Sequence, residues 1–307
     1  MSETDYQKMK EAFSRYLKGK RQSRKTITSR LNVLQSYQQW LDRENLEPEQ
    51  VSYTDLLSFM KYRSKQGASQ RTIQNYMSTI HHLYEYLKKE GKVSQNPTAD
   101  IEIKGVKRKI LYQILEPYEL QAIYNNYNED TPHGSRNKAM LGLLVNQGLK
   151  TEELARLEVK DVNLREGKVD IKGSRKSNGR EMQLEASQVM DMYDYVLKAR
   201  NELQQLPPKH KHQQQVESNK LFIGDGGNHS HFSNYVTQLM LKVKKINPSV
   251  QNAKQIRASV ITKWLRMYNL REVQYKAGHR YISSTESYQQ NDMEGLREEV
   301  QQYHPLG

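Results

Sequence analysis

Apolar residues recur at helical spacing through the first ninety residues of the chain. The periodic segments are residues 4–18, 31–41, 55–65 and 70–89. In the first of them the apolar positions are Met9, Phe13, Tyr16 and Leu17. Gly67 and Gly91 follow the last two segments, as glycine commonly follows the end of a helix. The pattern predicts a small, all-helical N-terminal domain over residues 1–100.

The pattern changes at residues 101–112, which carry a basic cluster and a glycine without helical periodicity. We interpret this stretch as a basic linker before a second domain, residues 113–307. A new helix is expected from Leu115-Glu-Pro, and an apolar core helix over residues 137–147. Two short β-prone runs, 168–171 and 180–184, flank a turn-like segment and predict a hairpin. A polar loop over 205–219 and a short helical tail over 293–303 are also expected.

The net charge of the chain indicates what kind of partner it binds. The 307 residues carry a formal net charge of +13, and residues 1–109 hold 21 Lys and Arg against 12 Asp and Glu. This excess of basic residues favours a polyanionic partner. A membrane surface is not favoured, because there is no long apolar run or basic amphipathic anchor and the mean hydropathy is −0.94.

The chain contains no cysteine, which excludes disulfides, cysteine-based zinc sites and thiol nucleophiles. Its first residues have no signal-peptide character, so we expect a cytoplasmic location. No phosphate-binding loop of the Gly-x-x-x-x-Gly-Lys type is present. The loop histidines lack acidic or cysteine partners; they are His210, His212, His229 and His231. We therefore expect neither a metal nor a cofactor.

Two predicted helix starts combine basic residues with small polar ones, in Ser23-Arg-Lys-Thr26 and Ser69-Gln-Arg-Thr72. Backbone amides at a helix start, together with such side chains, form a ready phosphate site, although solvated charges are the ordinary alternative. The basic linker can add affinity by releasing counterions without reading sequence. The candidate DNA-backbone contacts are Arg24, Lys25, Arg71, Lys107 and Arg108.

The stretch from Lys254 to Tyr288 holds the candidate chemistry. Lys254 and Arg257 are three residues apart on a predicted helix, so both can approach one anion such as a phosphate. A Gly278-His279 pair follows, and Tyr288 comes nine positions after the histidine. Each feature alone is ordinary: a solvated helix face, a turn, and one of 20 tyrosines. Their combination and order are what is informative.

That combination resembles the C-terminal signature of the tyrosine recombinases, the phage integrase family, in its two-domain, Xer-like form. Lys254, Arg257, Gly278-His279, Thr285 and Tyr288 occupy the signature positions. The segment Gly148-Leu-Lys-Thr-Glu-Glu-Leu resembles the family segment that carries the first active-site arginine, with Lys150 in its place. The predicted hairpin resembles the one carrying the catalytic lysine, and residues 73–98 resemble the core-binding domain.

The resemblance implies a mainly α fold. It consists of a helical, SAM-like core-binding domain and an α-rich catalytic domain with a small β-hairpin or sheet, of the DNA breaking-rejoining type. It also implies a site-specific recombinase or integrase, serving a mobile element, that acts on double-stranded DNA through a 3′-phosphotyrosine intermediate. The family works as a homotetramer on two duplexes, and residues 293–307 are candidates for docking on a neighbour.

The implied roles are as follows. Tyr288 is the nucleophile, Arg257, Lys254 and Lys150 stabilise the phosphate charge, and His279 holds the phosphate or takes the tyrosine proton. A hairpin lysine is the general acid, either Lys176 or Lys172. No metal or ATP is required, because the covalent intermediate conserves bond energy.

The chain departs from the family pattern at three places. Lys150 replaces an arginine and loses its planar fork, Ala258 replaces the usual histidine after Arg257, and the hairpin reads Gly173-Ser-Arg instead of Gly-Lys-Gly. The intact Lys254, Arg257, His279 and Tyr288 favour an active enzyme. The departures favour the alternative, a DNA-binding protein with decayed chemistry. A type IB topoisomerase would use the same pocket, but the compact N-terminal domain and short tail fit a recombinase better.

Overall fold

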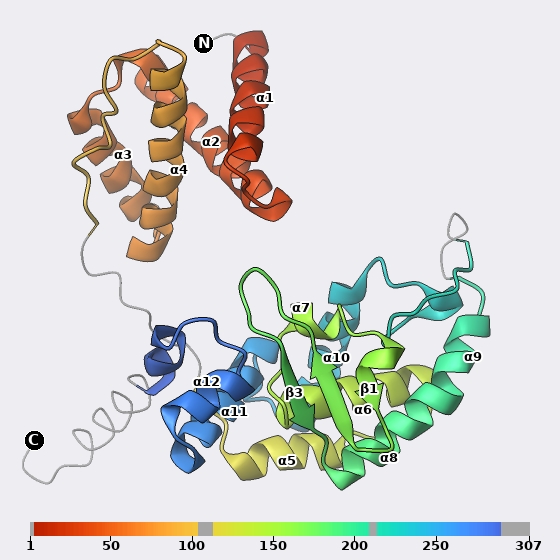
Figure 1. Cartoon of the computed structure of the whole chain (residues 1–307). Helices are drawn as coiled ribbons and strands as arrows, with labels where there is room; N and C mark the ends of the chain where they lie inside the picture. The colour runs from red at the N-terminus through yellow and green to blue at the C-terminus, as the bar shows by residue number, and fades with distance from the viewer. Residues whose placement is uncertain (1–2, 104–112, 209–213, 290–307) are drawn as a thin grey trace, which may run out of the picture. The chain divides into compact units, whose positions relative to one another are not determined.

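The computed structural model describes residues 3–103, 113–208 and 214–289 (Figure 1). The chain divides into two compact units, residues 1–107 and 108–307. Most of the expected linker, residues 101–112, and the expected tail, 293–303, lie outside the described residues, so the domain boundaries stay predictions. No helix in the described ranges is long and apolar enough to cross a membrane.

The N-terminal unit contains the four predicted helices. They are α1 (Glu3–Gly19), α2 (Arg24–Glu44), α3 (Tyr53–Lys65) and α4 (Gln70–Lys89), with a 3-10 turn η1 (Pro48–Gln50) before α3. Ser23 and Ser69 cap α2 and α4, each accepting a hydrogen bond from the backbone N–H three residues on. The basic residues expected to meet phosphates therefore stand at capped helix starts.

Aromatic side chains fill the centre of this unit. Phe59 of α3 packs edge-on against Tyr37 and Trp40 of α2, with ring centroids 5.1 and 5.2 Å apart. Tyr84 of α4 donates its hydroxyl proton to the Pro48 carbonyl at 2.9 Å, so Tyr37 must be the donor in the 2.9 Å bond between the two tyrosine hydroxyls. The buried hydroxyls are thus satisfied inside an apolar core.

The C-terminal unit is α-rich around one small sheet. Its helices are α5 (Pro117–Asn126), α6 (Pro132–Val145), α7 (Thr151–Leu154), α8 (Ala186–Asp194), α9 (Arg200–Gln205), α10 (Phe232–Ile246), α11 (Ala253–Met267) and α12 (Leu270–Lys276). A π-helical segment, η3 (Tyr195–Ala199), joins α8 to α9, and η2 (Val159–Asp161) and η4 (Asp225–Gly227) are 3-10 turns. Residues 283–289 are also helical.

The predicted hairpin is confirmed as β2 (Lys168–Ile171) and β3 (Arg180–Gln183), which pair antiparallel in the register Val169 with Met182 and Ile171 with Arg180. A third strand, β1 (Val162–Asn163), pairs with β2 and was not predicted. Two residues are too few to show a period of two, which explains why the pattern missed it.

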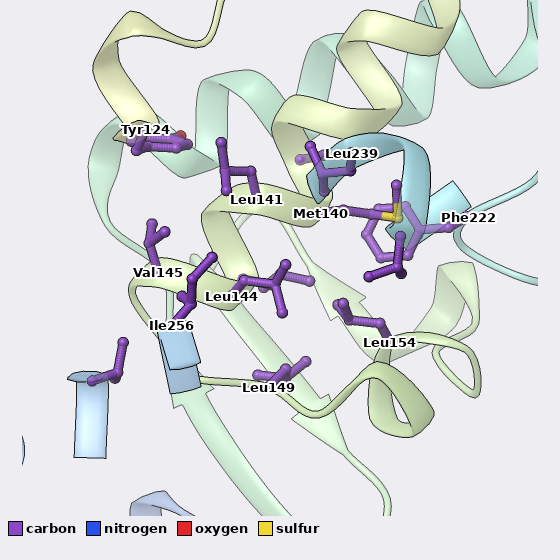
Figure 2. Packing of buried hydrophobic residues seen from close by; sticks show 14 of the residues in the cluster. Tyr124, Met140, Leu141, Leu144, Val145, Leu149, Leu154, Phe222, Leu239 and Ile256 are labelled. Carbon is purple, nitrogen blue, oxygen red and sulfur yellow. The ribbon is translucent and has the colours of Figure 1, made fainter. Parts of the chain in front are cut away.

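Helix α6 runs through the middle of the C-terminal core (Figure 2). Ten of its 14 residues are buried, so apolar contacts surround it on several sides. Met140, Leu141 and Leu144 have no exposed surface. Leu149, which follows the helix, is equally buried. The core thereby fixes the position of the Gly148 turn, where the candidate site begins.

Truncating Leu144 to alanine should lower the free energy of unfolding by about 2–5 kcal/mol, because it opens a cavity in this core. Leu197 of η3 is 49% exposed, and Leu197→Ala is the matched control, with an expected change under about 1 kcal/mol. Urea unfolding followed by circular dichroism measures both. Equal losses for the two variants would contradict this account of the core.

Candidate active site

Arg257 on α11 is the centre of the site. The helix starts at an Asn252 cap, whose side chain accepts from the backbone N–H groups of Lys254 and Gln255. The Arg257 guanidinium is buried and donates to the carbonyl oxygens of Gly148 and Ala277, the second at 2.6 Å. Two backbone turns that are far apart in the sequence therefore fix the direction of this side chain.

His279 lies directly after Gly278, whose φ of +61° is a left-handed conformation that favours glycine. A Cβ at this position would also lie 2.4 Å from Nη1 of Arg180. His279 is buried, with Nδ1 2.9 Å from the Thr285 hydroxyl and Nε2 3.2 Å from Nη2 of Arg257. Because a guanidinium can only donate, Nε2 accepts and Nδ1 carries the ring proton.

Electrostatics keep that imidazole neutral. Burial lowers the pKa of His279 to about 3, and the nearby positive charges of Arg257 and Lys150 contribute to the decrease. At neutral pH the ring therefore carries no charge, and its Nε2 lone pair is directed toward the cations of the site.

Tyr288 lies on the helical segment 283–289, three residues after Thr285, so both residues face His279. Its ring stacks on the imidazole at a centroid distance of 5.7 Å and an interplanar angle of 19°. Burial lowers the pKa of Arg257, while the charges of Glu153 and Tyr288 raise it. The structure thus brings Arg257, His279, Thr285 and Tyr288 together, as the spacing suggested.

Glu153 and Arg180 form a buried ion pair that sequence reasoning did not select. The two Arg180 amino groups donate to the two carboxylate oxygens at 3.1 and 3.0 Å, and neither side chain has exposed surface. Burial raises the pKa of Glu153, but the hydrogen bonds and charge of Arg180 outweigh it and lower the pKa overall. Glu153 was visible in the Gly148 motif, whereas nothing in the sequence marked Arg180 as its partner.

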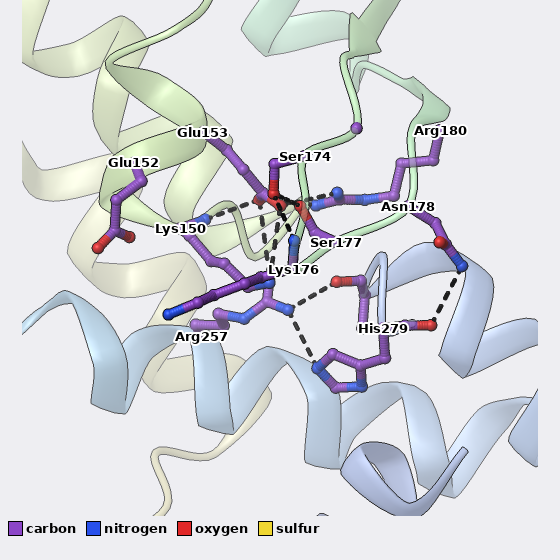
Figure 3. A network of polar contacts seen from close by, with 12 residues as sticks. Lys150, Glu152, Glu153, Ser174, Lys176, Ser177, Asn178, Arg180, Arg257 and His279 are labelled. Carbon is purple, nitrogen blue, oxygen red and sulfur yellow. Dashed lines mark hydrogen bonds and ion pairs between the residues drawn. The ribbon is translucent and has the colours of Figure 1, made fainter. Parts of the chain in front are cut away.

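Lys150 joins the same cluster (Figure 3). Its side chain is 30% exposed, with Nζ 3.9 Å from Oε1 of Glu153, and Nη1 of Arg257 is 3.9 Å from Oε2. Burial lowers the pKa of Lys150, as does the charge of Arg257. Three cations therefore surround a single carboxylate. This excess of positive charge would favour a bound anion.

The two candidate hairpin lysines have different surroundings. Lys172 forms ion pairs with Asp161 at 2.7 Å and Glu158 at 3.7 Å, and the hydrogen bond to Asp161 raises its pKa. Lys176 is exposed in the loop between β2 and β3. Of the two, Lys176 is the one whose ammonium is not engaged by a described carboxylate.

The remaining candidates that the structure describes are exposed. Lys254 lies one turn before Arg257, and Arg24, Lys25 and Arg71 stand at the starts of α2 and α4. Lys107 and Arg108 lie outside the described residues. Within residues 3–103, 113–208 and 214–289, no group of three or more His, Asp or Glu side chains is arranged to hold a metal ion.

Replacing Glu153 by glutamine should lower the free energy of unfolding by about 3 kcal/mol, since it leaves the buried Arg180 charge without its counterion. Glu152 is the exposed neighbour on α7, and Glu152→Gln should change stability by less than about 0.5 kcal/mol. Urea unfolding of both variants tests this. A stability of Glu153→Gln equal to that of the control would show that the ion pair is not structural.

Comparison with known proteins places these features in a family. The model described as "Phage integrase family" matches residues 113–294, and the "Phage integrase, N-terminal SAM-like domain" matches residues 11–91. The first match covers more than half of the chain and includes Arg257, His279 and Tyr288. The second covers most of the four-helix unit.

Individual relatives agree. The chain is 26% identical over 263 residues to tyrosine recombinase XerD of Listeria innocua, covering 84% of each protein, and 24% identical to XerD of Shewanella oneidensis, covering 92% and 91%. Its fold is similar to the XerH site-specific recombinase bound to difH (TM-score 0.71, 21% identity, 89% and 78% covered). It is also similar to the Tn1549 transposon integrase in complex with a circular intermediate DNA (TM-score 0.67, 16% identity, 91% and 94% covered). The chain therefore belongs to the phage integrase family and is a two-domain tyrosine recombinase.

Proposed function

We propose that this recombinase cleaves and rejoins duplex DNA at specific sites by transesterification, with Tyr288 as the nucleophile. The observation that carries the proposal is the position of His279, which contacts Thr285, Tyr288 and Arg257 at once. The proposed nucleophile, Tyr288, and the proposed phosphate-binding cation, Arg257, therefore both contact the His279 imidazole. The names of the relatives, among them XerD recombinases, and the DNA in the XerH complex support duplex DNA as the substrate.

The scissile phosphate would bind where positive charge is in excess. Attack on a phosphodiester places negative charge on the non-bridging oxygens, and cations already held in place stabilise it without reorganisation. Arg257 offers a fixed guanidinium, because carbonyl oxygens from two turns hold it. Lys150 adds charge beside Glu153, and Lys254, one turn before Arg257 on α11, would add charge as well.

Proton transfers complete the step. The Tyr288 hydroxyl oxygen forms a bond to phosphorus as the bond from phosphorus to the 5′-oxygen breaks. A free tyrosine has a pKa of about 10, so its proton needs an acceptor, and Nε2 of His279 can take it once Arg257 turns the bond that Nε2 accepts toward the phosphate. Lys176 would protonate the leaving 5′-oxygen. The products are a 3′-phosphotyrosine and a 5′-hydroxyl, and a 5′-hydroxyl from a second strand reverses the step without ATP.

The N-terminal unit would bind the DNA backbone through Arg24, Lys25 and Arg71, with Lys107 and Arg108 adding charge from the linker. The capped, exposed helix starts of α2 and α4 support the first three. We further propose that four copies act on two duplexes and that the reaction serves a mobile element. Net charge of +13 supports such DNA contacts, and the resulting affinity should fall steeply with salt.

A DNA-binding protein with weakened chemistry is the second candidate, and Lys150 is the observation that favours it. Its ammonium retains the charge near Glu153 but cannot hold two phosphate oxygens at once, as a guanidinium can. Ala258 also removes a hydrogen-bonding group next to Arg257, and it is buried in α11. The adduct assay described next separates the two candidates.

Tyr288→Phe should abolish covalent attachment to DNA and leave duplex affinity nearly unchanged, because only the attacking oxygen is removed. The probe is a nicked suicide duplex of the protein's own recombination site, selected beforehand from fragments of its source genome that bind the purified protein. Protein–DNA adducts are then separated on a denaturing gel, without metal or ATP. Tyr281→Phe, an exposed tyrosine in the turn after His279, is the matched control and should retain the adduct.

An adduct that persists in Tyr288→Phe would refute the nucleophile assignment. Tight, salt-sensitive binding by the unchanged protein with no adduct on any nicked site would instead support the weakened DNA-binding protein.

Lys150→Arg should raise the rate of adduct formation by about tenfold, the effect of one added charge-assisted hydrogen bond to the phosphate. Lys160→Arg is the control, since Lys160 is exposed on η2 and should not alter the rate. Single-turnover kinetics on the same suicide duplex measure both variants. A lower rate with unfolding behaviour intact would mean that the pocket requires lysine at this position.

A further inference from the structure

The loop that joins β2 to β3 ends in a tight turn with Lys176 at its tip. Regular pairing of the strands stops at Ile171 and Arg180. Ser174 and Ser177 then pair again, with backbone bonds of 2.7 and 3.3 Å and a 2.9 Å bond between their hydroxyls. Only Arg175 and Lys176 lie between these two serines. The Lys176 backbone is therefore locally fixed within the loop.

The same turn is also bonded to the His279 turn, about a hundred residues away in the sequence. On one side of Lys176, Asn178 donates its backbone N–H to the Gly278 carbonyl at 3.2 Å and its side-chain amide to the His279 carbonyl at 3.4 Å. Ser177 and His279 form an isolated antiparallel bridge. On the other side, Nη1 of Arg280 donates to the Arg175 carbonyl at 2.9 Å.

We propose that Asn178 and Arg280 are positioning residues for Lys176: they fasten its turn to the His279 turn, so that the general acid and the phosphate-binding site move as one body. This inference rests on the proposed function, in which Lys176 protonates the leaving oxygen. A proton donor must come within hydrogen-bond reach of that oxygen, and lysine has a long, flexible side chain. Fixing the turn at both sides of Lys176 limits the positions that its ammonium can take.

The surroundings of Lys172 support the choice of Lys176. Lys172 is already held by Asp161 and Glu158. An ammonium held by two carboxylates gives up its proton less readily and would have to break these bonds to reach a substrate. The bonds from Asn178 and Arg280 reach the part of the loop on either side of Lys176 instead. These contacts therefore favour Lys176 over Lys172 as the general acid.

A pair of suicide duplexes that differ in one atom tests the inference. One carries the normal bridging 5′-oxygen at the cleavage site, and the other carries sulfur in its place. A thiolate leaves without protonation, so defects in delivering the proton disappear on the sulfur duplex, while defects in phosphate binding persist. Adduct formation is measured in single turnover on both duplexes with the full-length protein.

Lys176→Ala should be slower by about a hundredfold or more on the oxygen duplex and near the unchanged rate on the sulfur duplex. Arg280→Ala and Asn178→Ala should each be slower by about three- to tenfold on oxygen, the effect of one lost hydrogen bond, and should be restored on sulfur. Lys150→Ala should be slow on both duplexes. Arg271→Ala is the matched control, because this exposed arginine bonds within α12 and not to the hairpin.

Equal slowing of Arg280→Ala and Asn178→Ala on both duplexes, or no slowing on either, would overturn the positioning role. The positioning role would also be overturned if the sulfur duplex restored the rate of adduct formation for Lys172→Ala but not for Lys176→Ala. An unchanged protein that forms no adduct on either duplex would refute the proposed function itself, which is a different result from failure of the variants alone.

Discussion

One buried carboxylate organises the catalytic unit. Glu153 accepts both amino groups of Arg180 with no exposure to solvent, and Arg257 and Lys150 lie at the edge of the same carboxylate. Desolvated charges are costly unless they are paired, and one negative charge cannot balance three positive ones. Carbonyl oxygens from Gly148 and Ala277 take up part of the imbalance at Arg257. A bound phosphate would supply the negative charge that these cations lack. The charges that hold the fold together at Glu153 would therefore also favour phosphate binding.

The same cations contribute to the neutral state of His279. Burial, and after it the charges of Arg257, Lys150 and Arg180, hold the imidazole neutral, and its folded pKa of about 3 lies below the ordinary value of 6.5. Between these values the unfolded chain binds a proton that the folded chain does not. This residue therefore lowers the free energy of unfolding as the pH falls from about 6.5 toward 3. A bound phosphate would oppose the cations and raise the basicity of Nε2, which is when a proton acceptor is needed.

Local periodicity was enough to predict α1 to α4, α6 and the β2–β3 hairpin, because each has a regular apolar pattern within itself. The resemblance of the 254–288 stretch to the family signature selected Arg257, His279 and Tyr288, which lie together in the structure, while their roles stay predictions. Spacing did not find the Glu153–Arg180 pair, since a charged residue opening a strand is normally solvated and its partner lies 27 residues away on another element. The Lys172–Asp161 contact was missed for the same reason. What escaped prediction is pairing between elements, which depends on how the elements pack.

The Glu153–Arg180 ion pair also explains why a lysine can be accommodated at position 150. The planar fork that a carboxylate accepts bidentately is supplied here by Arg180, whose two amino groups occupy both oxygens of Glu153. A lysine at position 150 needs no place on that carboxylate, and its flexible chain can turn its ammonium toward a bound anion while the backbone N–H keeps the α7 cap at 3.0 Å. The site thus has its positive charge in one fixed guanidinium, Arg257, and one movable ammonium, Lys150. In the proposed reaction the phosphate would be oriented mainly by Arg257, and Lys150 would add charge beside it.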